Sequence, residues 1–127
     1  MAYQEGIARE QAILFPETID DYIGEDNPVQ FIDAFVDSLD LRLLGFQRTQ
    51  PEETGRPPYH PGDMLRLYIW GYLNRVRSSR CLEKESHRNV EVMWLIKKLT
   101  PDFKTIADFR KDNRLKISLV EERLWLG

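Results

Sequence analysis

Basic side chains gather in the second half of the sequence at spacings that suit contact with a polyanion. Five of them fall between positions 75 and 88: Arg75, Arg77, Arg80, Lys84 and Arg88. Arg80, Lys84 and Arg88 step by four residues, so they share one face of any helix that carries them. Ser78 and Ser79 stand at the start of that helix, where hydroxyl and backbone N–H groups suit phosphate oxygens. This set favours binding to a nucleic-acid backbone.

A second basic set follows on the last predicted helix. Its members are Lys104, Arg110, Lys111 and Arg114. Three short helices with capped turns between positions 79 and 115 fit a helix-turn-helix-like arrangement, whose last helix enters the major groove of DNA. In that geometry the residues near its N-terminal end face the base edges: Thr105, Asp108, Lys111 and Asp112. Each bidentate base contact contributes roughly 1–3 kcal/mol of discrimination.

The net charge of −3 conceals a separation of charge along the chain. Residues 1–65 carry 13 Asp and Glu against 4 Lys and Arg, whereas residues 66–127 carry 14 Lys and Arg against 8 Asp and Glu. A polyanion is therefore expected to dock on the second half. The alternative is that solvated helix faces separate by sign without a functional reason.

Residues that catalyse reactions or bind metals are isolated in this sequence. His60, Cys81 and His87 show none of the CxxC, HxxxH or HExxH spacings of metal sites. Cys81 precedes Leu82 in an apolar-leaning stretch and is interpreted as a small core residue. There is no Gly-rich phosphate loop and no GxSxG motif. The acidic pairs are interpreted as surface charge, because none follows a predicted buried strand: Asp20–Asp21, Asp33–Asp37 and Glu52–Glu53. We expect no catalytic residue, metal or cofactor.

Length and composition indicate one small cytoplasmic domain. The 127 residues are enough for a modest core. The single cysteine excludes an internal disulfide framework and fits a reducing compartment. The first residues lack the basic and apolar regions of a signal peptide, and no apolar run approaches the length of a membrane span. The expected location is the cytoplasm, in association with the nucleoid if the chain binds DNA.

Apolar periodicity predicts an all-α fold, a small bundle of about five helices. Asn27 and Pro28 start the first helix, which carries one apolar stripe and ends at Gly45. The stripe consists of Val29, Ile32, Phe35, Val36, Leu39 and Leu43. Its other side carries Asp33, Asp37 and Asp40 and is expected to be wet.

Prolines punctuate the rest of the chain. Residues 46–61 form a proline-rich loop, and Pro61 opens a helix to Val76 that is apolar on most sides, so it belongs at the centre. A helix at 79–87 and an Asn89-capped helix at 90–98 follow. After Pro101, Thr105 and Asp108 resemble a capping box that starts a helix to position 115 or beyond.

Three parts are expected along the chain. Residues 1–26 form an N-terminal arm, which packs an apolar anchor at positions 13–15 onto the domain. Residues 27–115 form the helical domain. Residues 116–127 form a divergent tail, whose order the sequence leaves open.

Four motifs in order resemble a known family. They are Gly-Arg-Pro-Pro-Tyr-His-Pro (55–61), Arg-Ser-Ser-Arg-Cys-Leu-Glu (77–83), Asn-Val-Glu-Val-Met-Trp-Leu (89–95) and Pro-Asp-Phe-Lys-Thr-Ile-Ala-Asp-Phe-Arg (101–110). Their order and spacing are similar to the InsH-type N-terminal domain of bacterial insertion-sequence transposases of the DDE type, over residues 11–113. The resemblance implies that the helical domain binds double-stranded DNA at the terminal inverted repeats of the element.

The resemblance also implies what this chain lacks. In that family a ribonuclease-H-like domain follows, which uses Asp, Asp and Glu with magnesium to cut and join DNA. Residues 114–127 depart from the family pattern, so we expect a truncated transposase that binds DNA without strand transfer. None of the family's catalytic residues carries over, and the magnesium would belong to the absent domain.

A protein-interaction role remains open beside DNA binding. In that alternative the arginines pair with Glu83, Glu85 and Glu91, and the bundle associates with intact transposase and inhibits it. Self-association of transposase chains is a related expectation.

Overall fold

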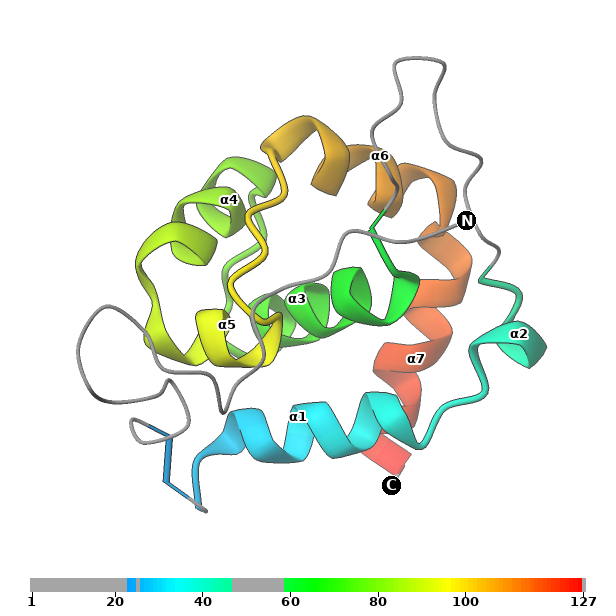
Figure 1. The fold of residues 1–127 in the computed structure, drawn as a ribbon. Helices are drawn as coiled ribbons and strands as arrows, with labels where there is room; N and C mark the ends of the chain where they lie inside the picture. The colour runs from blue at the N-terminus through cyan, green and yellow to red at the C-terminus, as the bar shows by residue number, and fades with distance from the viewer. Residues whose placement is uncertain (1–22, 25, 47–58, 127) are drawn as a thin grey trace.

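A computed structural model describes residues 23–24, 26–46 and 59–126. In these ranges every regular element is a helix, so the all-α prediction is confirmed. The elements are α1 (Pro28–Asp37), α2 (Leu41–Leu44), α3 (Pro61–Leu73), α4 (Ser79–Arg88), α5 (Val90–Leu95), α6 (Phe103–Asp112) and α7 (Arg114–Leu126) (Figure 1). Most of the predicted arm, including its apolar anchor, and most of the proline-rich loop lie outside the described residues.

Helix α3 lies at the centre of the bundle, as its sequence predicts (Figure 1). Pro61 occupies its first position, and the His60 imidazole Nδ1 accepts a 2.9 Å hydrogen bond from the Gly62 amide. From Pro61 to Gly71 every residue except Arg66 is buried. The helix ends at Leu73, earlier than predicted, and Arg75 just beyond it has a left-handed φ of 60°.

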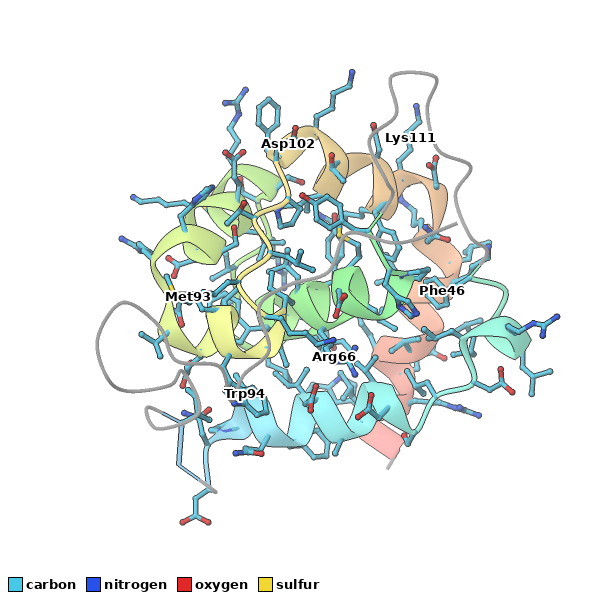
Figure 2. The ribbon with its side chains drawn as sticks, viewed as in Figure 1. Phe46, Arg66, Met93, Trp94, Asp102 and Lys111 are labelled. Atoms are coloured by element: carbon cyan, nitrogen blue, oxygen red, sulfur yellow. The ribbon has the colours of Figure 1, made fainter. Side chains whose placement is uncertain are left out.

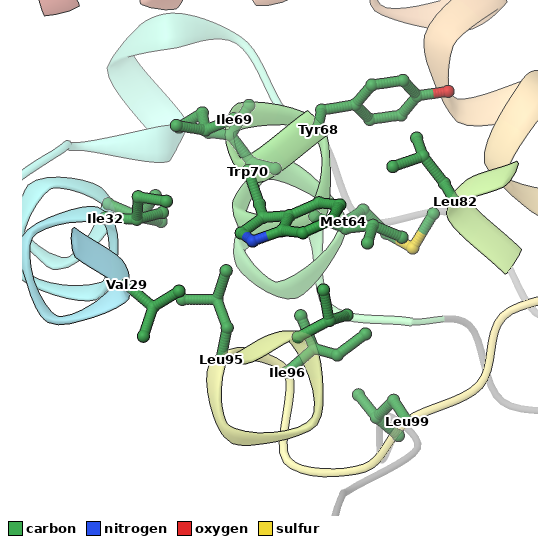
Figure 3. Close-up of a cluster of buried hydrophobic side chains, with 14 of the residues drawn as sticks. Val29, Ile32, Met64, Tyr68, Ile69, Trp70, Leu82, Leu95, Ile96 and Leu99 are labelled. Carbon is green, nitrogen blue, oxygen red and sulfur yellow. The ribbon is translucent and has the colours of Figure 1, made fainter. Parts of the chain in front are cut away.

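The core forms where helices converge on α3. Val29 and Ile32 of α1 and Leu95 of α5 lie around the buried ring of Trp70, and Leu82 of α4 lies beside Met64 (Figure 3). Burial of such side chains contributes about 1.5–3 kcal/mol each. This cluster fixes where α4 and α5 lie, and so where the predicted basic residues emerge.

Gly71 allows the chain to double back closely over α3. A Cβ at this position would lie 2.5 Å from the Val76 carbonyl oxygen and 2.9 Å from Cδ2 of Leu82. The Val76 amide donates a 2.8 Å hydrogen bond to the Gly71 carbonyl. The segment between α3 and α4, which holds Arg75 and Arg77, is therefore anchored on α3.

The prediction of one helix from Asn27 to Gly45 is wrong. Helix α1 starts as predicted, with Asn27 as its N-cap, but ends at Asp37. Asp40 starts α2, because its carboxylate accepts hydrogen bonds from the Arg42 and Leu43 amides at 3.1 Å each. Short polar side chains of this kind compete with continued helix. Leu43 consequently lies 86% exposed instead of in the core stripe.

The acidic side of the first helix was predicted to be exposed to solvent, but it is only partly so. Arg66, which lies between α3 and α1 (Figure 2), donates from Nε to Oδ1 of Asp33 at 2.9 Å and also pairs with Asp37. The Arg66 and Asp33 side chains are only 11% and 16% exposed. Spacing along the chain does not predict this pairing, because the two residues lie on different helices.

The expected tail contains an ordered helix, α7. Its residues Ile117 and Val120 are buried in the core, and Lys116 lies against Gly45. Among the described residues, no helix is long and apolar enough to span a membrane.

Candidate nucleic-acid interface

Helix α4 presents a basic outer face. Ser78 is its N-cap, with Oγ accepting from the Cys81 amide at 3.4 Å, so the predicted helix start is confirmed. Leu82 and Ser86 are buried on its inner side. The side chains that step by four residues all lie exposed on the other side: Arg80, Lys84 and Arg88.

Two contacts fasten α6 to α4. The Glu83 carboxylate Oε1 accepts a 2.7 Å hydrogen bond from the backbone N–H of Phe103, the first residue of α6. The Arg80 guanidinium lies over the Phe103 ring, 4.1 Å from its centroid. A guanidinium over an aromatic face is attracted by the ring quadrupole. Arg80 is thereby held in place at the junction of the two helices.

The predicted capping box of α6 is wrong. Asp102 caps the helix, since its Oδ1 accepts a 2.8 Å hydrogen bond from the Thr105 amide. Thr105 is therefore a half-buried first-turn residue, whereas Ile106 is fully buried. Figure 2 shows Asp102 and Lys111 at the two ends of α6. The exposed polar side chains of this helix are Lys104, Asp108, Arg110, Lys111 and Asp112.

Carboxylates occupy the N-terminus of α6. Glu83 and Asp102 both accept hydrogen bonds from its first-turn amides. This arrangement stabilises the helix, because negative charge complements the positive end of the helix dipole. It also makes this end of α6 unfavourable for phosphate. The exposed positive charges lie on α4 and, interleaved with Asp108 and Asp112, on α6.

A hydrogen bond connects the segment before α4 to the C-terminal part of α6. Arg110 donates from Nη1 to the Arg77 carbonyl oxygen at 3.3 Å. Arg75 and Arg77 are exposed, and Arg114 is exposed at the start of α7. The fold thus places both predicted basic sets on neighbouring elements.

One predicted arginine is partly neutralised. Arg88 Nε donates to Glu85 Oε1 at 3.0 Å, and this hydrogen bond holds the pKa of Glu85 below its usual value. Glu83 instead caps α6, and Glu91 Oε2 accepts a 2.9 Å hydrogen bond from the side-chain Nδ2 of Asn27. The expected pairing of arginines with these acids is therefore seen for Glu85.

Ser79 is half-buried, unlike the exposed Ser78 before it. The nearby Tyr68 phenol donates a hydrogen bond to the Ile106 carbonyl oxygen of α6. Burial raises the pKa of Tyr68 to about 12, while Ser79 and the positive charge of Arg110 act in the opposite direction.

The interpretation of Cys81 as a core residue is wrong. Cys81 is exposed, and Ser86 is the small buried residue of α4, only 1% exposed. Ser86 tolerates burial because its Oγ donates to the Glu83 carbonyl at 2.6 Å. Ser86 is buried and Cys81 is not, because Ser86 lies four residues after the buried Leu82 and so on the same face of the helix.

Among the described residues, no three His, Cys, Asp or Glu side chains cluster in a way that could hold a metal ion. The chemistry available on the basic surface is ionic contact and hydrogen-bond donation.

Comparison with known proteins adds a family. The family model described as Transposase domain (DUF772) matches residues 17–112, a range that includes α1 to α6. No curated protein and no solved structure matches the chain. Because the family model covers most of the sequence, the chain belongs to the transposase domain family DUF772.

Proposed function

We propose that this chain is the DNA-binding part of an InsH-type insertion-sequence transposase of the DDE class. It recognises the terminal inverted repeats of the element during transposition, in the cytoplasm at the nucleoid. Strand transfer, with its magnesium, is assigned to a separate catalytic domain. The observation that supports this most directly is the exposed row of Arg80, Lys84 and Arg88 on α4. Helix α4 packs against α6, which exposes Lys104, Arg110 and Lys111.

Helices α4 and α6 contact different parts of the DNA in this proposal. Helix α4 and the preceding segment bind phosphates, which supplies affinity without sequence preference. Helix α6 follows in the helix-turn-helix-like manner expected from the sequence. Because carboxylates occupy its N-terminus, the base contacts come from the exposed side of the helix instead, through Lys104, Asp108 and Lys111. Exposed carboxylates such as Asp108 suit the amino group of cytosine.

Fluorescence anisotropy with the inverted-repeat duplex of the encoding element tests this function. Binding should weaken steeply as salt is added, because bound phosphates release counterions. The Arg77→Ala/Arg80→Ala double variant should bind weakly, and its salt slope should fall by about 0.9 for each phosphate that is no longer neutralised. Lys84→Gln tests the same face without disturbing the stacking of Arg80 on Phe103.

The matched control is Arg42→Ala, which removes an exposed positive charge from α2, on the opposite side of the bundle from α4 (Figure 1). It should bind the duplex almost as the parent does. Binding that is equal for the parent and the double variant, or absent for both, contradicts the proposed surface.

A second candidate function is association with another transposase chain, which inhibits the intact enzyme. Leu115 and Leu119 lie one helical turn apart on the outer side of α7 and are 80% and 53% exposed. Exposed apolar patches of this kind favour protein contacts. A Leu115→Gln/Leu119→Gln variant should no longer co-purify with a full-length relative and should retain duplex binding. Monomeric behaviour of the parent in such a mixture contradicts this role.

A further inference from the structure

Arg80 is held in place by an uncharged partner. Its guanidinium lies over the ring of Phe103, 4.1 Å from the ring centroid. The quadrupole of an aromatic face attracts a guanidinium without adding an opposite charge. Among the described residues, no carboxylate pairs with Arg80 and no oxygen accepts a hydrogen bond from its side chain. Arg80 therefore keeps its charge and its N–H donors for a ligand.

Arg88, on the same exposed face of α4, is held in a different way. Its Nε and Nη2 both donate to Oε1 of Glu85, at 3.0 Å and 2.5 Å. That carboxylate offsets the positive charge and occupies N–H groups that a phosphate would otherwise use. Of the two arginines in the row, Arg80 is the one that is ordered without being neutralised.

The position of the Phe103 ring is itself fixed against α4. The backbone N–H of Phe103 donates a 2.7 Å hydrogen bond to Oε1 of Glu83, which lies one turn after Arg80. Ile106 is fully buried and anchors the same first turn of α6, which packs against α4 (Figure 1). The Phe103 side chain is nevertheless 39% exposed. The stacked pair thus lies at the surface, where a large ligand can reach the guanidinium.

We propose that Phe103 is a positioning residue for DNA binding, which orders the Arg80 guanidinium for a bidentate contact with one phosphate. An arginine loses rotamer freedom when it binds, and a ring that orders it beforehand reduces this cost. The planar guanidinium donates two parallel hydrogen bonds to a phosphate. An aromatic ring does not compete with that phosphate, as a carboxylate does. This inference rests on the proposed DNA-binding function and adds an uncharged residue to it.

Replacement of the ring at constant charge tests this role, with fluorescence anisotropy on the inverted-repeat duplex as the measurement. Phe103→Leu keeps an apolar side chain but removes the aromatic face. It should weaken binding roughly 2- to 10-fold, the range expected for ordering one long side chain. Phe103→Tyr retains the aromatic face and should restore the affinity of the parent. The matched control is Phe31→Leu on α1, where the exposed Phe31 ring stacks on Phe35 instead of an arginine, and it should bind as the parent does.

A double-mutant cycle assigns the effect to Arg80. In an Arg80→Ala background, Phe103→Leu should change the affinity by much less, because the ring then has no guanidinium to hold. Circular dichroism and urea denaturation establish that each variant is folded under the assay conditions. Phe103→Met, which also removes the aromatic face, provides a second variant if the leucine substitution does not fold.

The outcomes separate the role of Phe103 from the function beneath it. If the parent fails to bind the duplex at low salt, the DNA-binding function itself is wrong, and the role of Phe103 is wrong with it. If the parent binds with a steep salt dependence but folded Phe103→Leu binds equally well, only the role of Phe103 is overturned. An equal loss with and without Arg80 also overturns it, since the ring then acts through another residue.

Discussion

The carboxylate of Glu83 on α4 accepts a 2.7 Å hydrogen bond from the backbone N–H of Phe103, the first residue of α6. The residues are 20 positions apart, so this hydrogen bond caps one helix with a side chain from another. Arg80 lies one turn before Glu83 on α4 and covers the Phe103 ring. A basic face and the proposed recognition helix are thereby fixed to each other.

Removal of this inter-helix cap should destabilise α6. Glu83→Ala leaves the Phe103 amide without its carboxylate partner, and we expect a decrease in stability of about 0.5–1.5 kcal/mol, as for other N-terminal helix caps. Urea denaturation measures the decrease, and hydrogen exchange at the first turn of α6 should accelerate. Glu122→Ala, on the exposed side of α7, serves as the control. Equal midpoints for the two variants would contradict the capping role.

Gly71 should not tolerate a side chain. Gly71→Ala places a Cβ 2.5 Å from the Val76 carbonyl oxygen, which cannot move without displacing the start of α4. We expect a destabilisation of about 1–3 kcal/mol, typical of overpacked sites. Gly24→Ala is the matched control, because nothing lies within 4 Å of its added Cβ. The two denaturation midpoints should differ clearly, and similar midpoints contradict the close crossing.

Stability should fall at high pH through Tyr68. Burial raises its pKa from 10.0 to about 12, so its contribution is fully present below pH 10 and is lost as the pH rises through about 12. Tyr68→Phe removes the hydrogen bond to the Ile106 carbonyl and should be less stable than the parent at neutral pH. The difference in stability between the parent and the variant should shrink above pH 10. Unfolding of the parent lets Tyr68 ionise, which stabilises its unfolded state, whereas phenylalanine does not ionise. A constant difference across this range contradicts the raised pKa.

Replacement of Arg75 by glycine should preserve or raise the stability of the protein and weaken its binding to DNA. Its φ of 60° costs a non-glycine residue about 1–2 kcal/mol, and glycine adopts this conformation freely. Arg75→Gly should therefore be as stable as the parent or up to about 1 kcal/mol more stable, since glycine also loses more entropy on folding. The same variant should bind the inverted-repeat duplex more weakly. Unchanged affinity removes Arg75 from the proposed surface.

The local parts of the fold follow from the sequence alone. Asn27, His60, Ser78 and Asn89 each accept a hydrogen bond from an amide two or three residues later. The sequence predicts two of these caps, Asn27 and Asn89, and places Ser78 at the start of its helix. Such hydrogen bonds depend on neighbouring residues only, so spacing reveals them. The apolar pattern likewise predicts that α3 is central, and the ordered motifs indicate the transposase family that the family model confirms.

Competition between nearby polar residues explains two wrong predictions. Asp102 accepts from the Thr105 amide, so Thr105 is not the cap of α6. Asp40 caps α2 and so prevents the continuation of α1. Both errors have the same origin: several Asp and Thr residues within a few positions offer alternative caps, and the packing of the apolar side chains selects one of them.

Tertiary structure alone decided the electrostatic arrangement. The pairs Asp33–Arg66 and Arg77–Arg110 each join residues 33 positions apart, and Glu83–Phe103 joins residues 20 apart. Sequence spacing cannot reveal such pairs, since they depend on which helix faces pack together. The sequence determined that the second half carries the positive charge. The packing of α4, α6 and α7 decided which of these charges stand free on the surface, and which are held by a carboxylate or a carbonyl.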